Sequence, residues 1–225
     1  MKDLSRWQAR PTPGCTMLEG THVRLEPVQW GRHGSGLMAA VGGGDKADLW
    51  RYMALGPFDD VVALQTAFDK ACQTSGWRTM VIVCANTGVP LGMASYMRNR
   101  EAHGSTEVGC VAFSHALQRT TAATETIYLM ARHVFEDLGY RRFEWKCDDT
   151  NEASKRAALR FGFAYEGTFR NDMVIKGRNR DTAWYAMTDG DWPAIANAFC
   201  AWLSPMNFDA GGKQIARLES FRASR

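Results

Sequence analysis

Strand-like patterns of hydrophobic and polar positions recur along this chain. Residues 21–27 and 142–147 alternate apolar and polar side chains, as half-exposed strands do. Residues 78–84 form a short, continuously apolar run, which is typical of a buried strand. The Asn-Thr-Gly turn at 86–88 connects this run to a second strand at 91–97, so the two strands are predicted to form a hairpin.

Segments whose apolar residues have helical spacing lie between these strands. Residues 59–75 carry apolar side chains three and four positions apart, and a second such pattern runs from the turn at 118–125 to Gly139. A glycine at the end of the pattern is typical of a helix terminus. Asn151 is placed to cap a third helix, which Gly162 ends.

The order of these elements predicts one mixed α+β sheet. Strands at 163–175 and 181–187 and a helix from residue 191 complete the series. The result is a mostly antiparallel sheet of roughly seven strands, flanked by helices. A strand at 106–113, a helix and the strand at 142–147 form the unit in which two strands run parallel, and a ligand crevice is expected there.

The turn at 118–125 is the most informative stretch of the sequence. It reads Gln-Arg-Thr-Thr-Ala-Ala-Thr-Glu and opens the helix after the strand at 106–113. The first amides of a helix lack intrahelical partners and lie at the positive end of its dipole, so this turn is suited to bind an anion. It has neither the glycine pattern of dinucleotide folds nor the Gly-Lys-Ser/Thr of nucleotide triphosphatases. A bare helix start without a ligand is the alternative.

Composition excludes several classes of protein. The 225 residues are 45% hydrophobic, which is ordinary for a domain with a sizeable core. No apolar run reaches the ~20 residues of a membrane span. Residues 1–14 lack the apolar segment of a secretory signal, so a cytoplasmic location is expected. Six scattered cysteines without a Cys-x-x-Cys pair predict neither a zinc site nor a disulfide framework.

The net charge of +3 comes from the end of the chain. Residues 213–225 carry four basic residues and one acidic residue, so they account for the whole excess. The rest of the chain is neutral, with both signs interspersed, which argues against a nucleic-acid partner. A tail that binds nucleic acid is the alternative. We expect the tail to be solvated or loosely docked, with Ile215, Leu218 and Phe221 spaced as in a weak amphipathic helix.

Together these features resemble the GNAT superfamily, the acyl-coenzyme A-dependent N-acetyltransferases. The resemblance rests on the strand order, the 118–125 turn and the helix from Asn151 to Gly162-Phe163. Further matches lie at residues 49–52, 56–58 and 177–182. Within the superfamily, the pattern is most similar to the branch that contains the ribosomal-protein alanine N-acetyltransferases. The implied organisation is an extension at 1–16, a GNAT domain at 17–203 and a basic tail at 204–225.

The resemblance implies acetyl-coenzyme A as co-substrate and no metal. The turn amides are expected to bind the pyrophosphate of coenzyme A. The residues implied there are Gln118, Arg119, Thr120, Thr121, Ala122, Ala123 and Thr124. Thr121 stands where a glycine is usual, and its branched side chain requires a negative φ. Val111 and Phe113 are expected to offer amides to the thioester carbonyl and the pantetheine arm. Asn151 is expected to hydrogen-bond the pantetheine arm, and the alternative is that it acts only as a helix cap.

Two catalytic residues are implied. Glu107 matches a glutamate that the family often uses as a base, which is needed because amines are mostly protonated near neutral pH. The alternative for Glu107 is a half-exposed position with a cross-strand partner. Ser154 matches a serine proposed as proton donor in the narrower branch, since Ala158 occupies the place of the tyrosine that many relatives use. Weaker candidates are Glu125 as base and Tyr165 and Tyr185 as acids.

An acceptor site is implied before the second helix. Trp50, Tyr52 and Phe58 are expected to enclose the acceptor, and core packing is the alternative. Arg178 and Arg180 lie in a tight turn that is either solvated or faces an acidic acceptor or the second subunit of a homodimer. The predicted function is direct acetyl transfer to a primary amine of a small molecule or a peptide N-terminus. A non-catalytic module that binds acyl-coenzyme A is the alternative.

Overall fold

A computed structural model describes residues 3–222 of the chain. Within this range eight strands form one sheet in the order β1-β2-β3-β4-β5-β6-β8-β7, and only β5 and β6 run parallel. The strands are β1 (Leu18–Glu19), β2 (Val23–Pro27), β3 (Arg78–Cys84), β4 (Pro90–Arg100), β5 (Ser105–Phe113), β6 (Arg142–Asp148), β7 (Ala164–Ile175) and β8 (Arg178–Thr188). The α+β prediction is confirmed. The additional strand is β1, whose two residues are too few to form a hydrophobic pattern.

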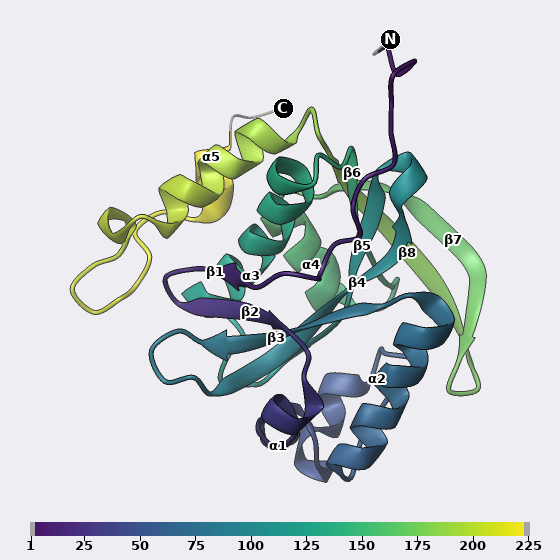
Figure 1. The fold of residues 1–225 in the computed structure, drawn as a ribbon. Helices are drawn as coiled ribbons and strands as arrows, with labels where there is room; N and C mark the ends of the chain where they lie inside the picture. The colour runs from purple at the N-terminus through teal and green to yellow at the C-terminus, as the bar shows by residue number, and fades with distance from the viewer. Residues whose placement is uncertain (1–2, 223–225) are drawn as a thin grey trace.

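Helices cover both faces of this sheet (Figure 1). The α-helices in the described chain are α1 (Trp30–Val41), α2 (Val61–Ser75), α3 (Thr121–Arg132), α4 (Glu152–Phe161) and α5 (Trp192–Leu203). Shorter helical turns are η1 (Gly44–Trp50), η2 (Glu101–His103), η3 (His133–Asp137), η4 (Pro205–Asn207) and η5 (Leu218–Phe221). One core lies between the sheet and α3, α4 and α5, and a second lies between the sheet and α1, α2 and η1.

Local signals set the helix boundaries, as the sequence predicts for α4. The Asp60 side chain accepts a hydrogen bond from the Ala63 amide at 2.8 Å and begins α2. Asn151 caps α4 in the same way, because its Oδ1 accepts from the Ser154 amide at 3.1 Å. Gly162 ends α4 with a φ of +95°, a conformation that glycine adopts at little cost.

The C-terminal tail docks on the domain, with Leu218 as its buried side chain. Leu218 in η5 is 1% exposed and packs in the core beside α5, and the Arg222 guanidinium donates to the Leu159 carbonyl at 3.0 Å. Ile215 is 69% exposed. The expectation of a solvated or loosely held tail is therefore wrong at Leu218, because burial of one leucine fixes the segment in place.

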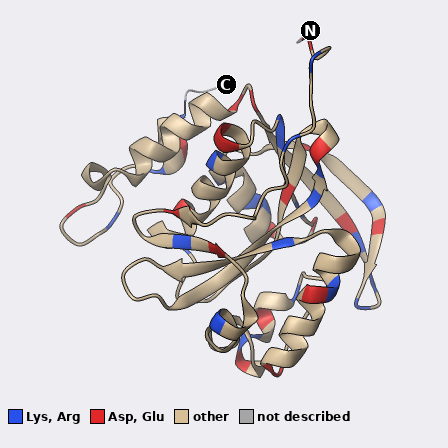
Figure 2. Ribbon diagram, in the orientation of Figure 1, with Lys and Arg blue, Asp and Glu red and all other residues tan. Residues whose placement is uncertain are grey.

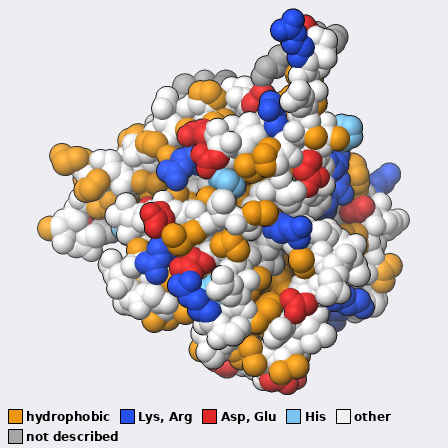
Figure 3. Space-filling model, viewed as in Figure 1, with side chains coloured by type: hydrophobic (Ala, Val, Ile, Leu, Met, Phe, Trp, Pro, Cys, Tyr) orange, Lys and Arg blue, Asp and Glu red, His pale blue; other side chains and the backbone are white. Residues whose placement is uncertain are grey.

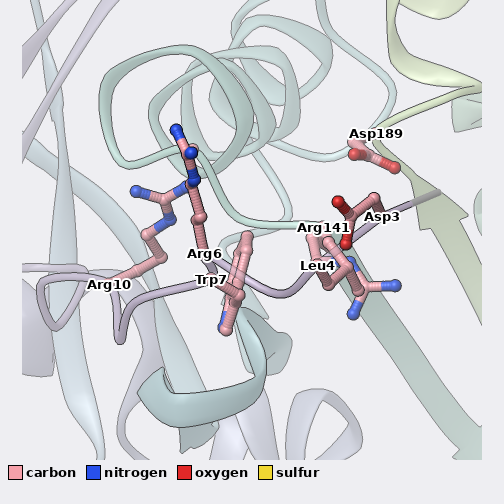
Figure 4. Close-up of a pocket in the computed structure, with 8 residues that line it drawn as sticks. Asp3, Leu4, Arg6, Trp7, Arg10, Arg141 and Asp189 are labelled. Atoms are coloured by element: carbon pink, nitrogen blue, oxygen red, sulfur yellow. The ribbon is translucent and has the colours of Figure 1, made fainter.

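The N-terminal extension lies along the side of the domain where the chain enters β6. The Trp7 indole donates to the Ala102 carbonyl at 2.8 Å, and the Arg10 amide donates to the Glu101 carbonyl at 3.0 Å. A cavity of about 300 Å³ lies between this extension and Arg141 (Figure 4). Its walls carry both charges, since Asp3 and Asp189 line it together with the arginines.

The surface charge of the folded chain is mixed, as the interspersed charges of the sequence predict. On the face seen in Figure 3, basic and acidic side chains are interspersed and do not gather into one basic surface. In the part of the chain that the structure describes, no helix has the length and apolar character needed to cross a bilayer.

Candidate functional site

The predicted crevice corresponds to the region where the two parallel strands, β5 and β6, separate. β5 and β6 pair from Ser105↔Arg142 to Val108↔Trp145, and the register does not continue past Val108. The β4–β5 register shifts in the same region, and Cys110 there has a φ of +47°. Such an irregularity bends a strand locally. The second half of β5 therefore keeps β4 as its partner and turns its other edge away from β6.

Backbone direction in β5 gives Val111 and Phe113 their orientation. The Ser114 amide donates to Leu91 at the start of β4, at 3.1 Å. Because N–H groups alternate along a strand, the amides of Phe113 and Val111 point to the opposite edge, where β6 has separated. Both predicted donors thus face the crevice.

The start of α3 presents unpaired amides beside this crevice. The Thr120 hydroxyl caps the Ala123 amide at 3.1 Å, and the Gln118 amide donates to Ser114 at 3.1 Å. Within residues 3–222, no acceptor is found for the amides of Arg119, Thr121 and Ala122. Three unpaired donors at the positive end of a helix dipole are suited to bind an anion.

The backbone of this turn accommodates a threonine where a glycine is usual. The left-handed residue is Arg119, with a φ of +62°, and Thr121 begins the helix with the negative φ that its branched side chain requires. The Gln118 side chain donates to the Phe113 carbonyl at 3.1 Å and so ties the turn to the end of β5.

Glu107 lies at the base of the crevice. Its side chain is only 4% exposed, and its Oε2 lies 3.0 Å from the Lys146 ammonium and 3.7 Å from Arg98 Nε. A Cβ added to Gly109 would approach Glu107 Oε1 to 2.9 Å, so the carboxylate runs along β5 to the point where the strands part. Burial raises the pKa of Glu107 despite the opposing effect of Lys146. The alternative for Glu107, a half-exposed position with a cross-strand partner, is wrong about exposure because the side chain is buried. The cross-strand partner is present, and it is Lys146.

Ser154 lies at the same crevice, on the first turn of α4. Its hydroxyl accepts a hydrogen bond from the Trp145 indole at 2.9 Å, and Trp145 is the last residue of β6 that pairs with β5. The hydroxyl also interacts with Cys147, whose thiol has a raised pKa because of burial. Ser154 and the unpaired amides of α3 thus follow the carboxyl ends of β6 and β5, whereas Glu107 lies earlier along β5, on the sheet face opposite Trp145.

The weaker candidates have other positions. Both carboxylate oxygens of Glu125 accept backbone amides at 2.7–3.0 Å, from Thr21, His22 and Val23, so this residue holds the turn before β2 and is unavailable as a base. Tyr165 is exposed and bonds Thr168. Tyr185 is buried on β8 and pairs with Trp145 in the β6–β8 register. Burial raises the pKa of the Tyr185 phenol.

Two of the three predicted acceptor aromatics lie in the core. Trp50 is 0% exposed, donates to the Val41 carbonyl at 2.7 Å and packs edge-on against Phe58. The structure therefore favours the core-packing alternative for this pair, because the ring of Trp50 has no surface that an acceptor could touch. Tyr52 is half-buried. Two residues earlier, the Trp50 carbonyl accepts a hydrogen bond from the Lys176 ammonium at 2.9 Å.

Sequence reasoning missed the side chains around Glu107. Lys146 and Trp184 are opposite each other in the β6–β8 register, and Lys146 also reaches Glu107 on β5. The alternation in β6 indicated that Lys146 is on the polar face, but only the sheet order shows what faces it. No group of three His, Cys, Asp or Glu side chains among the described residues is arranged to bind a metal.

Comparison with known proteins agrees with this geometry. Residues 35–164 match the acetyltransferase (GNAT) domain family. A GCN5-related N-acetyltransferase from Brucella melitensis is 39% identical, with a TM-score of 0.91 over 97% of this chain and 99% of that chain. The comparison with curated proteins gave no match.

Two more distant structures share the fold alone. Spermidine N-acetyltransferase from Vibrio cholerae, solved with CoA and spermine, is 16% identical, with a TM-score of 0.63 over 77% of this chain and 99% of that chain. Ribosomal-protein-S5-alanine acetyltransferase from Vibrio fischeri is 15% identical, with a TM-score of 0.62 over 79% and 98%.

Proposed function

Because the chain belongs to the GNAT family of acetyltransferases, we propose that it is an N-acetyltransferase that moves an acetyl group from acetyl-CoA directly to a primary amine. Acyl-CoA-dependent acetyl transfer is the activity that the family implies. The acceptor that we propose is a small molecule or a peptide N-terminus. The observation that carries the proposal is the row of three unpaired amides at the start of α3, beside the point where β5 and β6 separate.

The residues present fit coenzyme A. The amides of Arg119, Thr121 and Ala122 would hold its pyrophosphate, and the short side chains of the turn leave the approach open. The inward amides of Val111 and Phe113 would hold the pantetheine arm and the thioester carbonyl. Bound there, acetyl-CoA supplies an activated acetyl group.

Proton transfers are assigned to Glu107 and Ser154. The new C–N bond forms as the C–S bond breaks, so the amine loses a proton and the sulfur needs one. Glu107 would accept the first proton, for which a buried carboxylate with a raised pKa is suited. Ser154 is the proposed donor of the second, because it lies at the separated end of β6 and Ala158 is fully buried without a hydroxyl of its own.

Two measurements on the full chain test this proposal. Calorimetric titration with acetyl-CoA is expected to saturate at one equivalent. A free-thiol assay with a panel of amines, including spermidine because one fold neighbour is a spermidine N-acetyltransferase, is expected to show acceptor-dependent release of CoA. Saturation without thiol release across a broad panel would favour the non-catalytic acyl-CoA-binding module. Titration without any saturation would contradict both readings.

A further inference from the structure

A patch of buried polar atoms lies on the sheet face that carries Glu107. Four of the seven buried side-chain atoms without a hydrogen bond in the described chain gather there. They are Glu107 Oε2, Glu144 Oε2, Thr182 Oγ1 and Trp184 Nε1. The two carboxylate oxygens have cations 3.0–3.7 Å away, so among the described residues the Thr182 hydroxyl and the Trp184 indole N–H are the two groups of this set without a hydrogen-bond partner. The register aligns Glu107 with Glu144, Lys146 with Trp184 and Asp148 with Thr182, so these side chains share one face of β5, β6 and β8. Buried polar groups without partners cost free energy, so the Thr182 hydroxyl and the Trp184 indole N–H beside these charges indicate a ligand.

The patch carries more positive than negative charge. Glu144 Oε1 is already neutralised, because it accepts from Arg100 and Arg142 at 2.7 Å each. Lys146 pairs with Glu107, and Arg98 lies 3.7 Å from both Glu107 and Glu144. Arg142 also pairs with Glu166. Four cations therefore face three carboxylates. Figure 2 shows Lys and Arg positions interspersed with Asp and Glu positions over the ribbon. One cation is in excess, which favours a ligand with a negative group.

Trp184 organises these cations around its ring. The Lys146 ammonium lies 4.8 Å and the Arg98 guanidinium 4.9 Å from the ring centre, while the indole N–H is left without an acceptor. Arg98 reaches this position from a strained backbone, with a φ of +46° at a register shift in β4. Strain of this kind is common where a side chain is held for binding.

We propose that Lys146, Arg98, Trp184 and Thr182 bind a carboxylate of the acceptor, so that the acceptor is an amine that also carries a carboxylate group. This inference rests on the proposed acetyl transfer. The cations supply charge, and the indole and hydroxyl supply hydrogen-bond donors that an acceptor carboxylate can satisfy. The same carboxylate competes with Glu107 for Lys146. The acceptor thereby weakens the ion pair of Glu107 and leaves its carboxylate to take the ammonium proton.

Matched acceptors test the inference. The probes are glycine, L-alanine, β-alanine, 4-aminobutyrate and 6-aminohexanoate, each compared with its primary amide, with 1,5-diaminopentane as a cationic control. The expected result is that at least one acid exceeds its amide in kcat/KM by about tenfold or more, the effect of one charge-assisted contact. The diamine is expected to be the poorest acceptor of its length.

Three variants assign the effect to the patch. Trp184→Phe removes the indole donor but keeps an aromatic ring, and Lys146→Met removes the charge. Both are expected to reduce the acid-to-amide ratio to within about threefold of one, and Lys146→Arg is expected to restore part of it. Lys70→Met, which removes an exposed cation on α2, is the matched control and is expected to leave the ratio unchanged.

The outcomes separate the two proposals. Acetylation of amides as fast as acids overturns the carboxylate site but leaves the acetyltransferase intact. Saturable acetyl-CoA binding without transfer to any amine contradicts the proposed function. In that case calorimetric titration of the same probes into CoA-loaded protein decides. Binding of an acid that Trp184→Phe abolishes supports the carboxylate site, and equal binding of acids and amides overturns it.

Discussion

Glu107 owes its proposed role to its surroundings. Its carboxylate is buried next to the backbone of Gly109, close to Lys146 and Arg98, and the nearby charge of Glu144 adds to the desolvation that raises its pKa. Glu125, one turn into α3, is also buried, but three backbone amides occupy its oxygens. Two glutamates with similar burial therefore have different surroundings: Glu107 is the proposed base, and Glu125 holds a turn.

The pH dependence of turnover follows from the raised pKa of Glu107. As the pH falls through that value the carboxyl becomes protonated and cannot accept a proton, so kcat/KM is expected to fall at a pH above the ordinary glutamate range of ~4.3. Glu107→Gln is expected to remove this acidic limb and to lower kcat/KM by about 10²–10⁴-fold, with acetyl-CoA affinity nearly unchanged. Steady-state kinetics across pH provide the measurement.

Glu19→Gln is the control for this experiment, since Glu19 is exposed on β1, far along the sheet from β5. The Glu19→Gln variant is expected to keep both the kcat/KM of the parent and the acidic limb of its pH profile. A Glu107→Gln enzyme with an unaltered pH profile would remove Glu107 from the mechanism.

At the scale of elements, the crevice depends on a strand and a helix that share one connection. β5 loses its pairing with β6 after Val108, and the chain then turns through residues 114–120 into α3. Unpaired strand amides and unpaired helix amides consequently lie at the same end of the sheet. The Gln118 side chain links the two by its bond to the Phe113 carbonyl.

Ala122→Asp tests the helix start apart from its stability. A carboxylate in the first turn is favourable to the helix itself, by about 0.3–1 kcal/mol, but it repels a pyrophosphate. The variant is therefore expected to keep or raise the melting temperature while the Kd for acetyl-CoA, measured by calorimetry, increases by about tenfold or more. Ala122→Asn, the neutral isostere, is expected to stay within a few-fold of the parent. Equal affinity of the two variants would place the pyrophosphate elsewhere.

At the scale of the whole molecule, the tail is part of the domain that it follows. Leu218 enters the core beside α5, and Arg222 contacts the end of α4, which is the helix that carries Ser154. The order of the eight strands leaves β1 and β7 as the edges, with the crevice between β5 and β6 near the middle.

Leu218→Ala is expected to lower the free energy of unfolding by about 2–5 kcal/mol, because a fully buried leucine leaves a cavity. Ile215→Ala, three residues earlier and largely exposed, is expected to change it by less than about 0.5 kcal/mol. Urea denaturation of both variants provides the comparison. Similar midpoints for the two would show that the tail does not contribute to the stability of the domain.

Much of the fold was predictable because its signals are local. Asp60, Asn151 and Gly162 bound their helices by hydrogen bonds and φ angles that depend on neighbours within four residues. The hydrophobic periods likewise identified the strands from 78–84 to 181–187. β1 could not be predicted because two residues are too few to show a hydrophobic period. The position of Trp50 and Phe58 was ambiguous because an aromatic cluster packs equally well in a core or around a ligand.

The sequence alone therefore determined the type and order of the elements and the presence of a helix start with free amides at the α3 turn, since each depends on adjacent residues. Only the tertiary structure decided that Glu107, Lys146 and Trp184 meet, because they come from three strands whose neighbours are set by the order β5-β6-β8. It also decided that Glu125 is occupied and Leu218 buried. Contacts between distant segments depend on register and packing, which no local pattern encodes.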